Sequence, residues 1–198
     1  MNTLSFIFIL DKYRDFISFQ LISILFDSLS LISEQNILEN IIIILIEINS
    51  TFSENEKNYF LEEYEQNKNS RIFNEIVLIL LNRTEEKNRL TKLLLCIKYI
   101  LNREQKNFFN QKDLEIFMDI TLRNFETTFD NEIRTAFLDV LLLITKFNEF
   151  YNMMYKTKEL QDILDDFLKN DKLDKIMKGK CKKILKHIIK YLKMQLIF

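Results

Sequence analysis

The chain has no proline, no tryptophan and a single glycine, Gly179, among its 198 residues. Tight turns with positive φ and proline-built corners therefore have almost no residues to form them, whereas helix-compatible residues are abundant. The apolar content of 47% is enough for a domain with a sizeable core. We predict an all-α fold and a single domain over residues 1–198.

Residues that carry chemistry are scarce as well. The two cysteines, Cys96 and Cys181, lie in helical apolar patterns and form no C-x-x-C pair, which favours a reducing, cytoplasmic location. The single histidine, His187, is interpreted as a partly exposed helix residue. A chain with one glycine cannot build a glycine-rich phosphate loop, and no Cys/His set has metal-ligand spacing. We expect no enzyme activity, no metal and no cofactor.

Long hydrophobic runs are also missing. The apolar N-terminal run stops at Asp11, and Glu39 and Glu47 interrupt "ILENIIIILIEI", so neither reaches the roughly 18 apolar residues of a membrane span. The N-terminal run also lacks the basic region and cleavage site of a signal peptide. We expect a soluble protein without a transmembrane segment, whose N-terminal helix from Leu4 to Ile17 caps the fold or mediates self-association.

Periodicity divides the chain into about nine helices joined by short polar segments. Ser53 with Glu56, Ser70, Thr84 and Asp130 are the expected N-caps of four of them. Amphipathic helices mixed with helices that are apolar almost all round are typical of an armadillo/HEAT-like right-handed α-solenoid, more than of a four-helix bundle.

The helix after Asp130 has an apolar stripe at helical spacing, formed by Ile133, Phe137, Val140, Leu141 and Ile144. Arg134, Asp139 and Lys146 are expected elsewhere around this helix. In the polar joint further upstream, Phe108 and Phe109 are expected to plug a gap at the edge of the core.

The C-terminal part of the chain is strongly basic. From Asp171 onward nine lysines and two aspartates give a net charge of +7, in a chain whose total is −1. An amphipathic helix is expected over about residues 172–196, with the apolar stripe Met177, Cys181, Ile184, Leu185, Ile188 and Leu192. Two interpretations stay open. The helix packs by its stripe and shows its lysines to water, or its basic surface docks onto an acidic partner or an anionic membrane.

The candidate residues of that basic surface are Lys182, Lys183 and Lys186. Nucleic acid is the least favoured partner, because no aromatic residues suited to base stacking alternate with the lysines.

Five segments occur along the chain in this order: "IIILIEINSTF", "FNEIVLILLNR", "KNFFNQKDLEIFMDITLRNF", "NEIRTAFLDVLLLI" and "YKTKELQDIL". Together they resemble the WISH/DIP/SPIN family of actin nucleation regulators over about residues 42–167. The resemblance implies an armadillo-like domain that binds the actin-related protein 2/3 complex and activates it without a preformed filament, seeding linear filaments. It also implies a cytoplasmic location at cortical actin patches and a role in endocytosis.

The family pattern coincides with this chain at Asp113, Asp119, Arg123, Asn124, Arg134, Tyr155 and Lys156. The candidate partner-binding residues are Lys112, Asp119, Arg123, Asn124, Arg134 and Lys156, of which all but Lys112 match the family pattern. Arg123 and Asn124 are equally suited to satisfy the carbonyls at a helix end. Asp139 departs from the pattern, because the family has an arginine there. An armadillo-like adaptor or scaffold that binds another protein or an anionic surface through its basic C-terminal helix is therefore the alternative.

Overall fold

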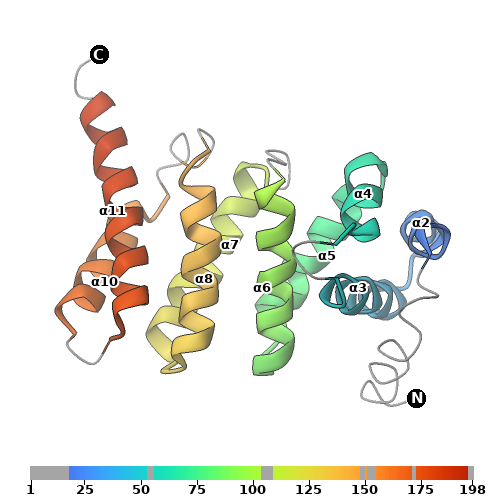
Figure 1. The fold of residues 1–198 in the computed structure, drawn as a ribbon, viewed down its shortest axis with the longest axis horizontal. Helices are drawn as coiled ribbons and strands as arrows, with labels where there is room; N and C mark the ends of the chain where they lie inside the picture. The colour runs from blue at the N-terminus through green and yellow to red at the C-terminus, as the bar shows by residue number, and fades with distance from the viewer. Residues whose placement is uncertain are drawn as a thin grey trace. The chain divides into compact units, whose positions relative to one another are not determined.

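The computed structural model of the chain describes residues 18–52, 56–103, 109–147, 150, 155–170 and 173–195. These residues form nine α-helices and no β-strand (Figure 1), which confirms the all-α prediction. The solenoid arrangement stays a prediction. The chain divides into two compact units, Met1–Ile100 and Leu101–Phe198, and the single domain also stays a prediction. The expected N-terminal helix over 4–17 lies outside the described residues.

The described residues of the first unit form five helices and a core of aromatic rings. The helices are α2 (Phe19–Ser28), α3 (Gln35–Ser50), α4 (Tyr59–Gln66), α5 (Ser70–Arg83) and, but for its last two residues, α6 (Lys87–Asn102). Phe26, Phe60, Tyr64 and Phe73 contact one another with ring centroids 5.4 to 6.4 Å apart. Such ring pairs add about 0.5–1.5 kcal/mol each beyond the area they bury, so they hold α2, α4 and α5 together.

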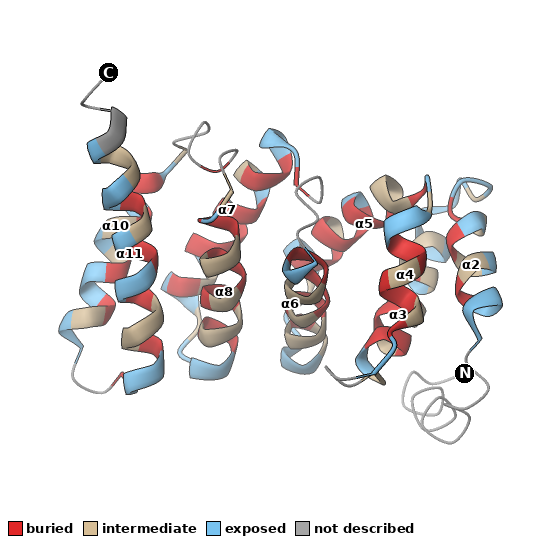
Figure 2. Ribbon diagram, turned by 45° about the horizontal axis from the view of Figure 1, so that its top comes forward, coloured by how far each residue is buried: buried red, intermediate tan, exposed pale blue. Residues whose placement is uncertain are grey.

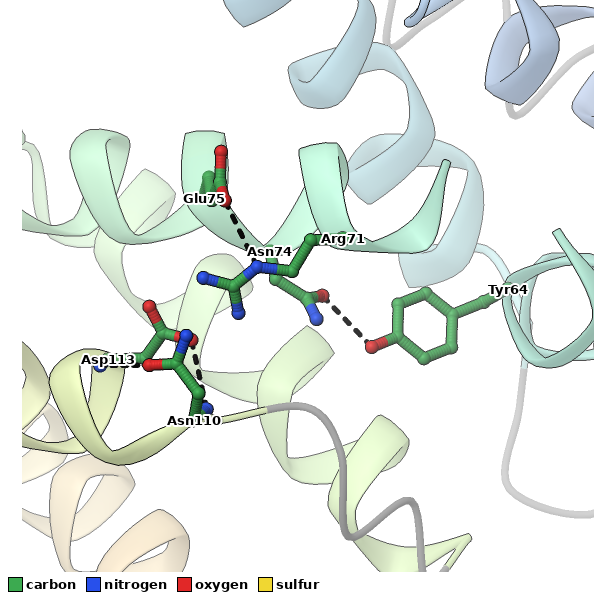
Figure 3. A network of polar contacts seen from close by, with 6 residues as sticks. All are labelled: Tyr64, Arg71, Asn74, Glu75, Asn110 and Asp113. Atoms are coloured by element: carbon green, nitrogen blue, oxygen red, sulfur yellow. Dashed lines mark hydrogen bonds and ion pairs between the residues drawn. The ribbon is translucent and has the colours of Figure 1, made fainter. Parts of the chain in front are cut away.

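Buried asparagines satisfy polar groups at the joints of this unit. Asn58 donates to the Asn49 side chain at 2.8 Å, and the Asn69 amide donates to the carbonyl oxygen of Phe26 at 3.0 Å. The Tyr64 hydroxyl donates to Asn74 Oδ1 at 2.9 Å (Figure 3). Because unpaired polar groups are costly in a core, these bonds let the joints stay buried without glycine or proline.

The second unit contains α7 (Gln111–Thr127), α8 (Asn131–Ile144), α10 (Thr157–Lys169) and α11 (Lys175–Gln195). Within it, α8 packs against α7 and α11, and α10 packs against α7 and α11. The helices α7, α10 and α11 each present a buried side to their neighbours and an exposed side to solvent, whereas α8 is buried or half-buried after its first two residues (Figure 2). All five residues of the stripe predicted for α8 are buried, which confirms that prediction.

Phenylalanines run through the core of the second unit. Phe109 lies 5.3 Å from Phe117, and Phe137 lies 6.1 Å from Phe117 and 6.2 Å from Phe125, measured between ring centroids. Phe109 is buried, so its predicted placement at the core is confirmed. Phe108 lies outside the described residues.

Three of the four predicted N-caps differ from those in the structure. The Thr84 prediction is wrong, because Thr84 is the C-cap residue of α5 and α6 begins only at Lys87. Asp130 caps α8 as expected, accepting from the backbone N–H of Glu132 and Ile133. The Ser70 prediction is wrong, because Asn69 precedes α5 and Ser70 is its first helical residue. The predicted box of Ser53 with Glu56 is wrong as well, because α4 begins at Tyr59 and its cap is Asn58; Ser53 itself lies outside the described residues.

Candidate functional site

One exposed face of α7 gathers the charged residues that the sequence singled out. Lys112, Asp119 and Arg123 are exposed, and their three- and four-residue spacing through Ile116 places them along one side of the helix. Ile116 is 37% exposed, an apolar side chain in the middle of this charged row. We call these four residues the α7 stripe. The sequence pattern alone does not identify Ile116 as a surface residue, because it does not show which side of α7 faces solvent.

A capping box fixes where α7 begins. The Asn110 side chain accepts from the Asp113 N–H at 2.8 Å, and the Asp113 carboxylate accepts from the Asn110 N–H at 3.0 Å (Figure 3). Asp113 is 5% exposed, so this family-matched aspartate stabilises the helix start. Asn-x-x-Asp ahead of an apolar run is a sequence signal for such a box.

Residues from a second segment extend the α7 stripe. Lys156 Nζ lies 2.8 Å from Asp119 Oδ1, and the Tyr155 hydroxyl lies 3.4 Å from Asp119 Oδ2. The hydrogen bond to Asp119 is the main reason why the pKa of Lys156 is raised. An exposed ion pair adds little stability, so its main consequence is to place Tyr155 and Lys156 beside the stripe.

Lys156 reaches this position through an unusual backbone. It precedes α10 as its N-cap residue with φ 50°, the one non-glycine residue with positive φ in the described part of the chain. The left-handed region costs an L-residue about 1 kcal/mol. A turn that holds this conformation fixes the direction in which the Lys156 side chain leaves the chain.

Arg134 lies in the core, contrary to the expected position off the apolar stripe of α8. Its guanidinium donates to the carbonyl oxygen of Phe125 at 2.9 Å and lies 4.9 Å from the Phe167 ring centroid. The side chain is 8% exposed, and burial lowers its pKa. The expectation failed because the buried face also includes Leu138, which widens it to take in Arg134. Arg134 thus ties α8 to the end of α7 and to α10.

Asn124 also serves its own helix. Its amide donates to the carbonyl oxygen of Ile120 at 2.8 Å, and the residue is half-buried. Of the six candidate partner-binding residues, Lys112, Asp119, Arg123 and Lys156 therefore combine exposure with a shared surface. Their contact with a partner stays a prediction.

The basic residues of α11 face different surroundings. Lys180 forms an ion pair with Asp139 of α8, and these side chains are only 18% and 24% exposed. Lys182 and Lys186 are exposed and line an open groove beside α10, whereas Lys183 is exposed outside that groove. The apolar stripe of α11 is buried from Met177 to Ile188, which confirms that the helix packs by this part of the stripe, while the last predicted member, Leu192, is half-buried. Lys180 carried no sequence signal of its role, because its partner lies 41 positions away.

His187 and Thr145 form a second polar contact between α8 and α11. His187 Nδ1 lies 3.1 Å from Thr145 Oγ1. Burial lowers the pKa of His187, and the charges of Lys146, Lys186 and Lys190 lower it further. The folded state therefore favours the neutral ring, while the unfolded chain takes up the proton near pH 6.5.

The free energy of unfolding should therefore fall as the pH drops below about 6.5. His187 is the single histidine of the chain, so His187→Gln should flatten this slope between pH 7.5 and 5.5. Urea unfolding at several pH values measures the effect. An unchanged slope in His187→Gln would assign the pH dependence to other groups.

The described residues contain neither a cluster suited to a metal ion nor a reactive thiol. No group of three or more His, Cys, Asp or Glu side chains converges among them. Cys96 and Cys181 are both buried, and burial raises the pKa of the Cys181 thiol to about 11. No helix in this part of the chain is long and apolar enough to cross a membrane.

One family model matches most of the residues discussed above. It is described as SPIN90/Ldb17, leucine-rich domain, and it matches residues 34–160, well over half of the chain. The match takes in α3 to α8 and the first turn of α10, while α11 lies beyond it. It overlaps the resemblance expected over about residues 42–167 and confirms it. No curated protein matches the chain.

Proposed function

The chain belongs to the family of the SPIN90/Ldb17 leucine-rich domain, which is linked to actin regulation, and from this premise we propose that it binds the actin-related protein 2/3 complex and activates it without a preformed filament. Its product would be a linear actin filament that primes a branched network. The family domain is regulatory rather than enzymatic. We place this activity in the cytoplasm, at cortical actin patches that serve endocytosis.

The α7 stripe with Tyr155 and Lys156 is the observation that carries the proposed binding surface. It lies within the residues matched by the family model, and it joins exposed charges of both signs to an exposed isoleucine and a tyrosine. Protein interfaces combine an apolar or aromatic centre with a charged rim that sets orientation. The ion pair of Lys156 with Asp119 places the two segments of this surface side by side.

Activation would be conformational. A surface that binds the active arrangement of the complex more tightly than the inactive one shifts the population by that difference in affinity. A shift from 1:99 to 99:1 requires about 10⁴-fold tighter binding to the active arrangement. A rigid helical surface suits this task, because it does not relax to fit both arrangements equally well.

The test is polymerisation of actin monomers with the purified complex and no filament seeds. The chain should shorten the lag, and the filaments should be unbranched under the microscope. In the double variant Lys112→Glu/Arg123→Glu, about tenfold more protein should be needed for half of the effect, because two rim charges of the surface are reversed.

Lys183→Glu is the matched control, since it reverses an exposed lysine far along the sequence from α7 and should leave the lag as short as the original chain does. An unchanged lag at saturating concentrations of the original chain would refute the proposed activity. If Lys112→Glu/Arg123→Glu shortens the lag as effectively as the original chain does, the proposed binding surface is refuted, while the proposed activity stands.

A further inference from the structure

A groove between α10 and α11 combines an apolar floor with a row of lysines. It is open to solvent, has a volume of about 490 Å³, and its apolar lining consists of Leu168 from α10 and Leu185 and Ile189 from α11. Its other lining residues all come from α11: Lys182, Lys186, Lys190 and Lys193. The two helices lie side by side in both views of the fold (Figures 1 and 2).

We propose that this groove binds a short amphipathic helix of a protein partner, with aliphatic residues on the inward side and glutamates or aspartates along its edges. The lining residues of α11 recur at spacings of three and four from Lys182 to Lys193, so they follow one side of the helix. That row is about 16 Å long, or three helical turns. A partner helix of similar length lying along α11 would place one apolar residue per turn over the floor.

Charge decides which kind of helix fits. In the described part of the chain, no carboxylate forms an ion pair with any of the four groove lysines. Lys180 shows the contrast, because this lysine of the same helix is engaged by Asp139. Four positive charges beside an apolar floor favour acidic side chains at the edges of the occupant and disfavour basic ones.

The groove suits a helix better than it suits a lipid surface. A helix that lies in a membrane inserts its apolar face, but the apolar stripe of α11 is already buried, with Met177, Cys181 and Ile184 each at 0% exposure. Of the apolar residues with which α11 lines the groove, Leu185 is 8% exposed and Ile189 is 46% exposed. A concave floor of this kind can be filled by the side chains of a partner helix.

This inference does not rest on the proposed actin activity. The α7 stripe lies within the residues matched by the family model, whereas α11 lies beyond them. A chain that fails to shorten the actin lag can still bind an acidic helix, and the reverse also holds.

The probe is a fluorescein-labelled peptide of about 18 residues, with leucines at every third or fourth position and glutamates beside them. Titrated with the full chain, it should show a saturable rise in anisotropy and a gain of helicity by circular dichroism. Lys186→Glu/Lys190→Glu should weaken binding about tenfold or more. Ile189→Ser, which removes the exposed apolar contact without changing charge, should weaken it about fivefold.

Lys183→Glu is the matched control, because it reverses an exposed lysine of α11 outside the groove and should leave the affinity unchanged. A scrambled peptide of the same composition should bind at least about tenfold more weakly. The proposal is overturned if the scrambled peptide binds as tightly as the designed one. It is also overturned if Lys183→Glu weakens binding as much as Lys186→Glu/Lys190→Glu does, or if Lys186→Glu/Lys190→Glu binds the peptide as tightly as the original chain. Absent peptide binding, with capture of vesicles containing about 30% phosphatidylserine, would overturn it in favour of a membrane.

Discussion

Replacing Arg134 by alanine should lower the free energy of unfolding by about 3 kcal/mol. The change removes a buried hydrogen bond from a charged donor, worth about 1.5–3 kcal/mol, and a cation–π contact worth about 1–2 kcal/mol in a desolvated site. Both contacts are seen here, to the carbonyl oxygen of Phe125 and to the ring of Phe167. Urea unfolding followed by circular dichroism measures the loss.

Arg134→Met separates packing from charge. Methionine fills much of the same volume without bringing a charge into the core, and an apolar replacement of a buried charged group is often well tolerated. We expect Arg134→Met to cost about 1 kcal/mol. If both variants unfold like the original chain, Arg134 does not tie α8 to α7 and α10.

Asp139→Arg should lower the free energy of unfolding by about 2 kcal/mol, although it restores the residue type of the family pattern. The new guanidinium would face Lys180, whose side chain is only 18% exposed and now forms an ion pair with Asp139. Breaking a pair that is mostly shielded from water costs more than breaking an exposed one, and the like charges add repulsion.

The exchanged pair Asp139→Arg/Lys180→Asp is the control for this prediction. It restores opposite charges across α8 and α11 and should recover more than half of the lost stability. A double variant as unstable as Asp139→Arg would show that the contact depends on more than charge. If the double variant recovers the lost stability, the aspartate at position 139, which departs from the family pattern, and Lys180 of α11 are energetically coupled.

The parts of the fold that depend on local periodicity could be predicted from the sequence. The stripe of α8, the stripe of α11 and the cap at Asp130 follow from spacing within one helix, and the structure confirms them. The missed caps at Asn58 and Asn69 have another cause. In a chain so rich in asparagine, the sequence does not show which asparagines lie at helix ends and which lie elsewhere.

The candidate site could be predicted only in part. The family resemblance pointed to Asp119, Tyr155 and Lys156, but their meeting depends on how α10 packs against α7, over 36 positions in sequence. The predicted five-residue stripe leaves Arg134 outside it, whereas the buried face of α8 is wide enough to include both Leu138 and Arg134. The guanidinium of Arg134 contacts the carbonyl oxygen of Phe125 in α7 and the ring of Phe167 in α10. The spacing of residues within α8 does not predict contacts with other helices.

The left-handed backbone at Lys156 links the shape of a turn to the direction of a surface charge. Glycine at this position would relax the backbone but remove the ammonium group that reaches Asp119, and asparagine would tolerate the backbone but be too short for that contact. Lys156 therefore adopts the left-handed backbone conformation and also supplies the long charged side chain that reaches Asp119. The chain has a single glycine, which lies elsewhere. The left-handed turn at Lys156 therefore orients the ammonium group of this lysine in the free protein, without a bound partner.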